Sequence, residues 1–261
     1  MIDNNKAKFK IKNNDLAIGG VVTYGDPGVT EALCASGFDF IWIDGEHGPL
    51  DYKDIDLHIL ATKAWDCESF VRVRSFEPHI VRPILDMDPS AIIFPLIKSA
   101  TDARIAVESC KYPPLGVRGF GPRRANNYAT LENEKYLEKA KNNPWVILQI
   151  EHIEAVKNLE GILNTPGIDA IIIGPNDLSG SMGCLGQIRN PEVLKVLDKI
   201  SEMCIKTKIP FGTAVMSSNK ENLLEWLKRG VSFISLDVDY LYLVNSGKNA
   251  IKNTIELYKN K

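Results

Sequence analysis

Short apolar runs alternate with segments of helical spacing eight times along the chain, and this alternation limits the possible folds more than any other feature. Runs that are apolar throughout and bounded by glycine or proline are typical of parallel strands buried on both faces. They predict strands at 17–22, 38–43, 69–73, 91–96, 145–151, 168–173, 210–215 and 233–236.

Between these runs, apolar residues recur three and four positions apart, which indicates helices packed on a sheet. The predicted helices are 29–36, 51–64, 77–87, 99–110, 131–141, 155–164, 191–206 and 219–229. Parallel strands return through right-handed helical crossovers, and eight of them can close a ring, so the predicted fold is an α/β (β/α)₈ TIM barrel. An open doubly wound sheet is the alternative, but no Gly-x-Gly-x-x-Gly follows the first strand.

The length of 261 residues suits one barrel, because such barrels usually have about 250 residues. No shift in composition marks a linker, so we expect a single domain over 1–261. Residues 112–122 are rich in glycine and proline, which predicts a long irregular loop of the kind that often covers a site. Segment 243–258 is expected to be either a closing helix or an arm that packs on, or is swapped with, a neighbouring subunit.

The net charge of −2 provides no general attraction to nucleic acid or to an anionic membrane. The five cysteines are widely spaced and form no C-x-x-C, which fits a reducing cytosol better than a disulfide framework or a zinc site. No apolar stretch approaches about 18 residues, and the first residues lack the apolar core of a signal peptide. We therefore expect a soluble, cytoplasmic protein without a nucleic-acid or membrane partner.

Polar side chains gather where the predicted strands end, which in a TIM barrel is the end that carries the active site. The carboxylates Glu151 and Asp177 follow neighbouring strands, and such oxygen ligands bind Mg²⁺ or Mn²⁺ while leaving positions for water and substrate. A three-histidine zinc site is not expected, because His58, His79 and His152 fall on helices or just past a strand end. The full set at the strand ends is Asp44, Glu46, His47, Arg72, Arg74, Gln149, Glu151 and Asp177.

Each candidate also has a purely structural alternative. Asp177 can cap the short helix that follows it, Glu151 can be a solvated strand end, and Arg72 can pair with a structural carboxylate. Their coincidence with His47 at successive strand ends favours one shared site.

The other charged residues near these ends are expected to contribute less. We interpret Arg74, Glu46 and His152 as loop or supporting residues. Arg123 and Arg124 are either a contact for a second anionic group or solvated surface charge.

The residue types at the strand ends indicate enolate chemistry on a 2-oxo acid. A divalent cation can chelate the carboxylate and keto oxygens and polarise the carbonyl. His47 can act through a water as the base that removes a proton from the adjacent carbon, with Arg72 beside the developing oxyanion. Backbone N–H groups of residues 174–177, at a helix start, can hold the substrate carboxylate. No lysine lies convincingly at a strand end, which disfavours a Schiff-base aldolase.

Five segments, in order between about residues 15 and 245, make the chain resemble the HpcH/HpaI aldolase family, the class II, metal-dependent pyruvate aldolases. The resemblance implies reversible cleavage of a 4-hydroxy-2-oxo acid into pyruvate and an aldehyde, with Mg²⁺, Mn²⁺ or Co²⁺ bound. The segments are Asp44-Gly45-Glu46-His47, the strand end at Arg72, Tyr112-Pro113-Pro114 with Arg118-Gly119, Gln149-Ile150-Glu151, and Gly174-Pro175 with Asp177-Leu178-Ser179.

The same resemblance implies roles for individual residues. His47 would be the general base with Asp44 close to it, and Arg72 the transition-state stabiliser. Asp86 would raise the basicity of the histidine; since it lies at a helix end on the wrong side of its own barrel, a neighbouring subunit would deliver it. The implied assembly is a homo-oligomer, a hexamer or trimer of dimers. The implied metal ligands are Glu151 and Asp177, and the implied substrate contacts are Arg72, Gln149, Gly174, Pro175, Asn176 and Asp177.

Asn176 departs from the family pattern, which usually has a small residue such as alanine there, so the pocket edge is expected to be tighter or more polar. Two other functions remain open from the residues: decarboxylation of an oxaloacetate-type 2-oxo acid through the same enolate, and a barrel that binds a metabolite without turnover. The presence of a base among the polar strand ends disfavours the second, because binding alone requires none.

Overall fold

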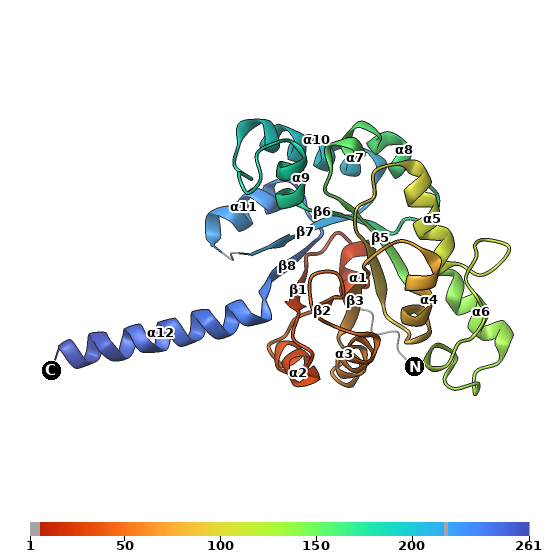
Figure 1. Ribbon diagram of the computed structural model, residues 1–261, viewed down its shortest axis with the longest axis horizontal. Helices are drawn as coiled ribbons and strands as arrows, with labels where there is room; N and C mark the ends of the chain where they lie inside the picture. Colours follow the sequence, from red (N-terminus) through yellow and green to blue (C-terminus); the bar gives the residue numbers. More distant parts are fainter. Residues whose placement is uncertain (1–5, 217–218, 261) are drawn as a thin grey trace.

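The computed structural model describes residues 6–216 and 219–260, and within them eight parallel strands form a closed barrel (Figure 1). Each strand pairs with the next, and β8 returns to β1, so the predicted (β/α)₈ barrel is confirmed. Strand boundaries differ from the predicted ones by at most two residues. The strands are β1 Ala17–Val22, β2 Phe40–Asp44, β3 Glu68–Arg72, β4 Ala91–Phe94, β5 Trp145–Ile150, β6 Ala170–Ile173, β7 Phe211–Val215 and β8 Phe233–Val238.

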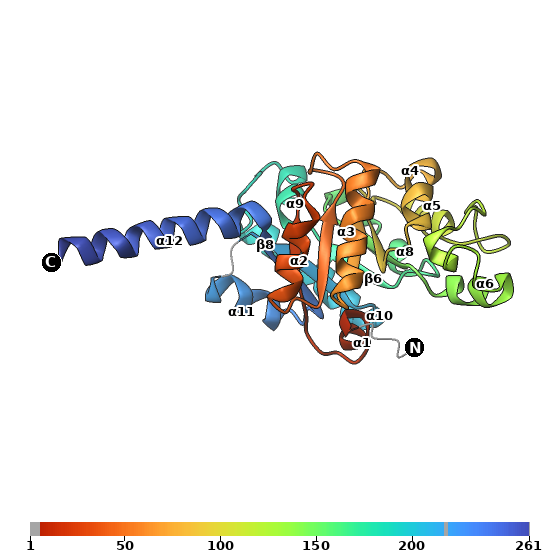
Figure 2. The same cartoon turned by 90° about the horizontal axis from the view of Figure 1, so that it is seen from below.

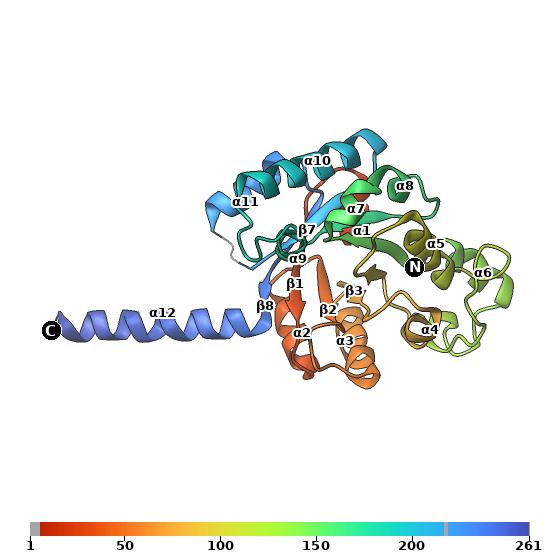
Figure 3. The ribbon, with the colours of Figure 1, turned by 45° about the horizontal axis from the view of Figure 1, so that its top comes forward.

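Helices surround the barrel (Figure 3). Several begin at a clear cap: Asp51 and Ser99 each close a capping box in which side chain and backbone bond reciprocally. The helices are α1 Lys6–Lys12, α2 Pro27–Ala35, α3 Tyr52–Ala64, α4 Pro78–Asp86, α5 Ala100–Cys110, α6 Asn133–Lys141, α7 Ile153–Lys157, α8 Leu159–Leu163, α9 Pro175–Ser181, α10 Pro191–Thr207, α11 Lys220–Lys228 and α12 Asp239–Lys259, with a 3₁₀ turn at Arg124–Asn126.

Two helical segments differ from the prediction. The expected helix 155–164 is two short helices, α7 and α8, that meet at Asn158; its side chain donates to the Lys98 carbonyl rather than continuing one helix. Helix α1 was not predicted, because its alternating lysines give no amphipathic stripe. Two of its three apolar side chains, Ala7 and Ile11, are nevertheless fully buried and join the cluster inside the barrel, whereas Phe9 is exposed. The predicted irregular loop at 112–122 is confirmed.

The barrel interior is filled by aromatic rings below the strand ends. Phe40 and Phe70 stack with centroids 4.4 Å apart, and Phe233 meets both edge-on at 6.2 and 6.5 Å. Gly19 makes room for them, since a Cβ there would overlap the Phe40 ring. The interior is therefore a packed core and not a channel, and side chains above it form the floor of any site.

Helix α12 extends away from the barrel (Figures 1 and 2). Of its residues only Asp239, the first, is buried. The expectation of a closing helix packed on its own barrel is thus wrong, and the geometry is that of an arm. Its exposed apolar side chains are Leu243, Val244, Ile251, Ile255 and Leu257. Among the described residues, no helix combines the length and apolarity that crossing a membrane would need.

Candidate functional site

A cavity of about 390 Å³ opens at the carboxyl ends of the strands. Its lining comes from β1, β2, β3, β5, β6, β7 and β8 and from the residues that follow them. The volume falls in the usual range for small-molecule sites. The sequence-predicted residues that line it are Asp44, His47, Arg72, Gln149, Gly174, Pro175, Asn176 and Asp177.

Arg72 is held rigidly at one side of this cavity. It pairs in register with Asp44 of β2, donating from Nε to Oδ1 at 2.9 Å and from Nη2 to Oδ2 at 2.5 Å. Its Nη1 lies 2.8 Å from Oε2 of Glu46, and the guanidinium lies over the Trp42 ring at 5.1 Å. A fork held by two carboxylates cannot rotate freely, so the remaining N–H groups are presented to the cavity in a fixed direction.

Asp44 also shapes the turn that carries His47. Its Oδ1 accepts from the backbone N–H of Glu46 at 3.0 Å and of His47 at 3.2 Å. The turn is tight: a Cβ on Gly45 would lie 2.7 Å from the Arg72 carbonyl oxygen, and one on Gly48 would lie 2.6 Å from that of Asp44. The expected proximity of Asp44 and His47 is thus a backbone contact, which fixes where the imidazole begins.

The His47 side chain reaches outward from this turn and is 68% exposed. Its Nε2 lies 3.9 Å from Oε2 of Glu46, beyond hydrogen-bond distance. The ring therefore stays accessible to water and substrate.

Glu46 is the residue that sequence reasoning undervalued. The sequence predicts a loop or supporting residue without a named partner, and in the structure Glu46 forms the second ion pair of Arg72. Burial raises the pKa of its carboxyl, and the Arg72 charge opposes that rise. The signal that could have found it is its place in the chain: the turn directly after Asp44 lies at the same strand end as Arg72 of the neighbouring strand.

Glu151 lies at the end of β5 and is only 3% exposed, so the alternative of a solvated strand end is wrong. Its Oε1 accepts from the Leu96 backbone N–H at 2.7 Å, and Oε2 accepts from Nε2 of Gln149. Burial raises the pKa of the Glu151 carboxyl, and the nearby charge of Asp177 raises it further. A buried carboxylate with a second, exposed carboxylate nearby would be stabilised in its ionised form by a cation bound to both.

Asp177 lies in the first turn of α9 and faces the cavity. Gly174 is the N-cap of that helix and no side chain caps it, so the alternative of Asp177 as the cap is also wrong. A Cβ on Gly174 would lie 2.8 Å from Cβ of Glu151 and 3.0 Å from its Oε2. Glycine at 174 thus lets the β6 end approach the β5 carboxylate.

These oxygens fit a hard divalent cation. Besides the two carboxylates, the Oε1 of Gln149 is buried without a hydrogen-bond partner, so it is a third oxygen with free capacity to bind a cation. Across residues 6–216 and 219–260, no three His, Cys, Asp or Glu side chains converge as a ready metal cage. Mg²⁺ and Mn²⁺ commonly use one or two protein carboxylates and take the rest from water and substrate.

Asp86 is not brought to this cavity. It ends α4, just before β4 begins, and so lies toward the opposite end of the barrel. Nη2 of Arg118 lies 3.3 Å from its Oδ1 and donates at 3.0 Å to the Leu85 carbonyl. Burial raises the pKa of the Asp86 carboxyl, while the Arg118 charge opposes that rise.

The other charged candidates have structural partners. Arg124 donates to both carboxylate oxygens of Asp56, at 2.5 and 3.0 Å, so it is neither an anion contact nor free surface charge. His58 is fully buried in α3, and His152 caps α7 by accepting from the Glu154 N–H at 3.1 Å.

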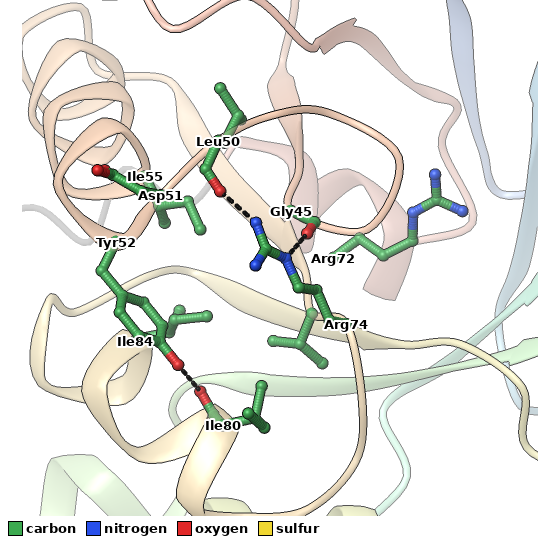
Figure 4. Close-up of a pocket in the computed structure, with 10 residues that line it drawn as sticks. Gly45, Leu50, Asp51, Tyr52, Ile55, Arg72, Arg74, Ile80 and Ile84 are labelled. Atoms are coloured by element: carbon green, nitrogen blue, oxygen red, sulfur yellow. Dashed lines mark hydrogen bonds between the residues drawn. The ribbon is translucent and has the colours of Figure 1, made fainter.

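Arg74 contacts the backbone of the turn that bears His47 and does not line the main cavity. It extends into a second, smaller pocket of about 140 Å³, while Arg72 turns away from that pocket (Figure 4). Its Nε donates to the Gly45 carbonyl at 2.8 Å and its Nη2 to that of Leu50 at 2.7 Å. Arg74 therefore fixes the turn that bears His47, consistent with its interpretation as a supporting residue.

Comparison with known proteins agrees with this geometry. The model of the family described as HpcH/HpaI aldolase/citrate lyase matches residues 22–246. A hydroxypyruvate/pyruvate aldolase from Roseobacter denitrificans is 30% identical over 94% of this chain and 95% of its own. A 4-hydroxy-2-oxo-heptane-1,7-dioate aldolase from Escherichia coli is 32% identical over 84% of this chain and 82% of its own. The solved structure of an HpcH/HpaI aldolase/citrate lyase family protein from Burkholderia cenocepacia has a TM-score of 0.90 and 28% identity, covering 96% of this chain and 99% of that chain.

Proposed function

The chain belongs to the HpcH/HpaI aldolase/citrate lyase family, and from this premise we propose that it is a divalent-metal-dependent aldolase, a carbon–carbon lyase. The proposed reaction is the reversible cleavage of a 4-hydroxy-2-oxo acid into pyruvate and an aldehyde through a pyruvate enolate. One observation supports the proposal: Asp177, a rigidly held guanidinium and an accessible imidazole line one cavity, and the buried carboxylate of Glu151 lies beside it, bonded to the lining residue Gln149 and close enough to Asp177 to feel its charge.

The pyruvate half is assigned to the β5 and β6 ends. Glu151 and Asp177 would hold the cation, which when bound polarises the keto oxygen and offsets negative charge that develops there. The backbone N–H groups that begin α9, together with Gln149, would orient the substrate carboxylate. Besides its two hydrogen bonds to Asp44 and its ion pair with Glu46, Arg72 has further N–H groups on Nη1 and Nη2, and these can stabilise the enolate oxygen.

His47 is the proposed proton carrier. In cleavage it accepts, through a water, the proton of the 4-hydroxyl group as the bond between C3 and C4 breaks and its electron pair moves into the enolate. The aldehyde leaves, and His47 returns a proton to C3, which yields pyruvate. A base placed at high exposure beside a cavity can exchange protons with water between these two steps.

Deuterium exchange at the methyl group of pyruvate tests this function directly. With added Mg²⁺, Mn²⁺ or Co²⁺, mass spectrometry should show methyl deuteration in D₂O that needs no aldehyde, because enolate formation alone exchanges the proton. EDTA should stop the exchange, and restoring the cation should restore it. Binding of pyruvate without exchange would instead favour a barrel that senses a metabolite, and full exchange under EDTA would refute the cation.

We further propose that the active unit is a homo-oligomer in which Asp86 acts on a neighbouring subunit's His47. Asp86 lies outside its own cavity and is held in place by Arg118. Helix α12 leaves apolar side chains such as Leu243 and Ile251 exposed on a helix that contacts little of its own barrel. A second copy of the chain would bring its Asp86 to the cavity and would cover the exposed apolar side chains of α12.

Complementation distinguishes action between subunits from action within one. Asp86→Asn and His47→Gln should each be nearly inactive alone, and their co-expression in equal amounts should restore about one quarter of wild-type exchange, since random pairing gives one site in four with both residues intact. Differently tagged chains purified in tandem ensure that hybrids are measured. No recovery in a verified hybrid, or full activity of a monomer, would contradict the proposed role of Asp86.

A further inference from the structure

One wall of the cavity has no part in the assignments above. It lies at the ends of β7, β8 and β1, whereas the cation ligands follow β5 and β6 and the histidine and arginine follow β2 and β3. We call it the β8–β1 wall. Among the lining residues that the structure describes, this wall carries no charged side chain, so it suits an uncharged group. Its members are Val21, Thr23, Ala214, Met216, Val238 and Tyr240.

Asp239 hydrogen-bonds to residues on both sides of this wall without lining the cavity itself. It is 2% exposed, and Oδ2 accepts from the backbone N–H of Thr23 at 2.6 Å and of Tyr24 at 2.8 Å. Oδ1 accepts from the Thr23 hydroxyl at 2.8 Å and from the Tyr240 N–H at 2.9 Å. Hydrogen bonds to carboxylates are comparatively strong, and the three from Thr23 and Tyr24 join the β1 end to the start of α12, while the fourth orients Tyr240 within that helix.

A bulge in β8 directs the Asp239 carboxylate toward Thr23 and Tyr24. Gly20 pairs with Leu236 but Val21 pairs with Val238, so Asp237 is an extra residue in the ladder, with φ of 45°. Such a bulge re-aims the side chains that follow it. Because side chains alternate along a strand, one residue fewer would turn Asp239 to the other side and away from Thr23.

The Thr23–Tyr24 turn is also held from its other sides. The Tyr24 carbonyl oxygen lies 2.9 Å from Nε2 of His58, whose Nδ1 lies 2.7 Å from the Thr30 hydroxyl. Burial lowers the pKa of His58, which favours the neutral ring that donates to Tyr24 and accepts from Thr30. A Cβ on Gly48 would lie 3.3 Å from the Thr23 carbonyl oxygen, so the turn that carries His47 packs directly on Thr23.

We propose that the β8–β1 wall receives the aldehyde half of the substrate and that Asp239 is its positioning residue. The proposal rests on the aldolase function, which assigns the pyruvate half to the β5 and β6 ends. Asp239 touches no substrate. It acts by setting where Thr23 and Tyr240 stand, and these two residues flank the opening from opposite ends of the chain.

Asp239→Asn tests the proposal. An amide keeps the size of the carboxylate but turns its NH₂ toward at least one of the backbone N–H donors, so the hold on Thr23 and Tyr24 weakens. In the condensation of saturating pyruvate with glycolaldehyde, a neutral probe, the KM for the aldehyde should rise about 10- to 100-fold. Metal-dependent deuteration of pyruvate alone should stay within about two-fold of wild type, because it does not use this wall and because Asp44 and Arg74 hold the turn that bears His47 independently of Asp239.

Two further variants make the result decisive. Asp26→Asn, in the same turn, changes a carboxylate that caps α2 by accepting from the Gly28 N–H at 2.8 Å, and it should leave both reactions unchanged. Tyr240→Ala shortens the wall without removing the Asp239 carboxylate, so it should raise the aldehyde KM even if Asp239→Asn fails to fold.

The outcomes separate the two hypotheses. An unchanged aldehyde KM in Asp239→Asn or in Tyr240→Ala would overturn the assignment of the wall. Equal losses in condensation and in deuteration would show that Asp239 is merely structural and overturn its role. A wild-type protein that neither deuterates pyruvate nor condenses it would overturn the aldolase function first, and the inference with it.

Discussion

Replacing Glu151 and Asp177 together with alanine should lower metal-dependent pyruvate deuteration by about 10³-fold or more, because a Lewis acid contributes several kcal/mol and each 1.36 kcal/mol is a factor of ten. Titration calorimetry with Mn²⁺ should show the matching loss of cation binding. Glu151 is buried, and both its burial and the nearby charge of Asp177 raise the pKa of its carboxyl, so a bound cation would favour the ionised form of this pair.

The control for this variant is Glu154→Ala, which removes a 58% exposed glutamate just after the same strand and should change neither measurement. Glu151→Gln in place of alanine retains an oxygen for the Leu96 N–H. It therefore separates loss of the negative charge from loss of folding. Unaltered Mn²⁺ affinity in the double variant would show that the cation, if any, binds elsewhere.

Replacing His47 with glutamine should reduce pyruvate deuteration by about 10²- to 10⁴-fold, the usual contribution of a positioned general base. Cation binding should stay as in wild type, since the imidazole is not among the proposed ligands. The thermal midpoint should also stay unchanged, because a side chain that is 68% exposed contributes little to the packed core.

His79 offers a matched comparison, because it is 70% exposed and lies on α4 beside Glu77 at 3.4 Å. His79→Gln should leave deuteration intact, so any general effect of losing an exposed histidine is subtracted. Wild-type deuteration in His47→Gln would remove the assignment of the base and leave the proton to another group.

The barrel and the gathering of Asp44 and Arg72 at one of its ends could be predicted from the sequence, because both follow from short-range rules; the ion pair between the two was not predicted. An apolar run bounded by glycine predicts a buried strand, and neighbouring parallel strands end at the same edge. Residues at the ends of β2 and β3 therefore meet, and Asp44 and Arg72 do so in register. Glu151 and Asp177 were found in the same way.

What the sequence could not supply depends on distant partners. Asp239 bonds to Thr23 across 216 positions of sequence and depends on a bulge that no local pattern marks. The ion pair of Glu46 with Arg72 was not predicted, because Glu46 lies in a turn, where no strand register fixes the direction of a side chain. The direction of α12 was likewise undetermined, since its apolar positions fit either its own barrel or another chain.

The placement of α12 has a mechanical consequence. With 21 residues it is about 32 Å long, and it begins at Asp239, which grips Thr23 at the rim of the cavity. A lateral force on the far end of α12 would therefore be transmitted through Asp239 to Thr23 at the cavity opening. Attaching the protein to a support through residue 260 would therefore apply mechanical force to the residues around the cavity opening. Attachment near α1, at the other end of the barrel, would not.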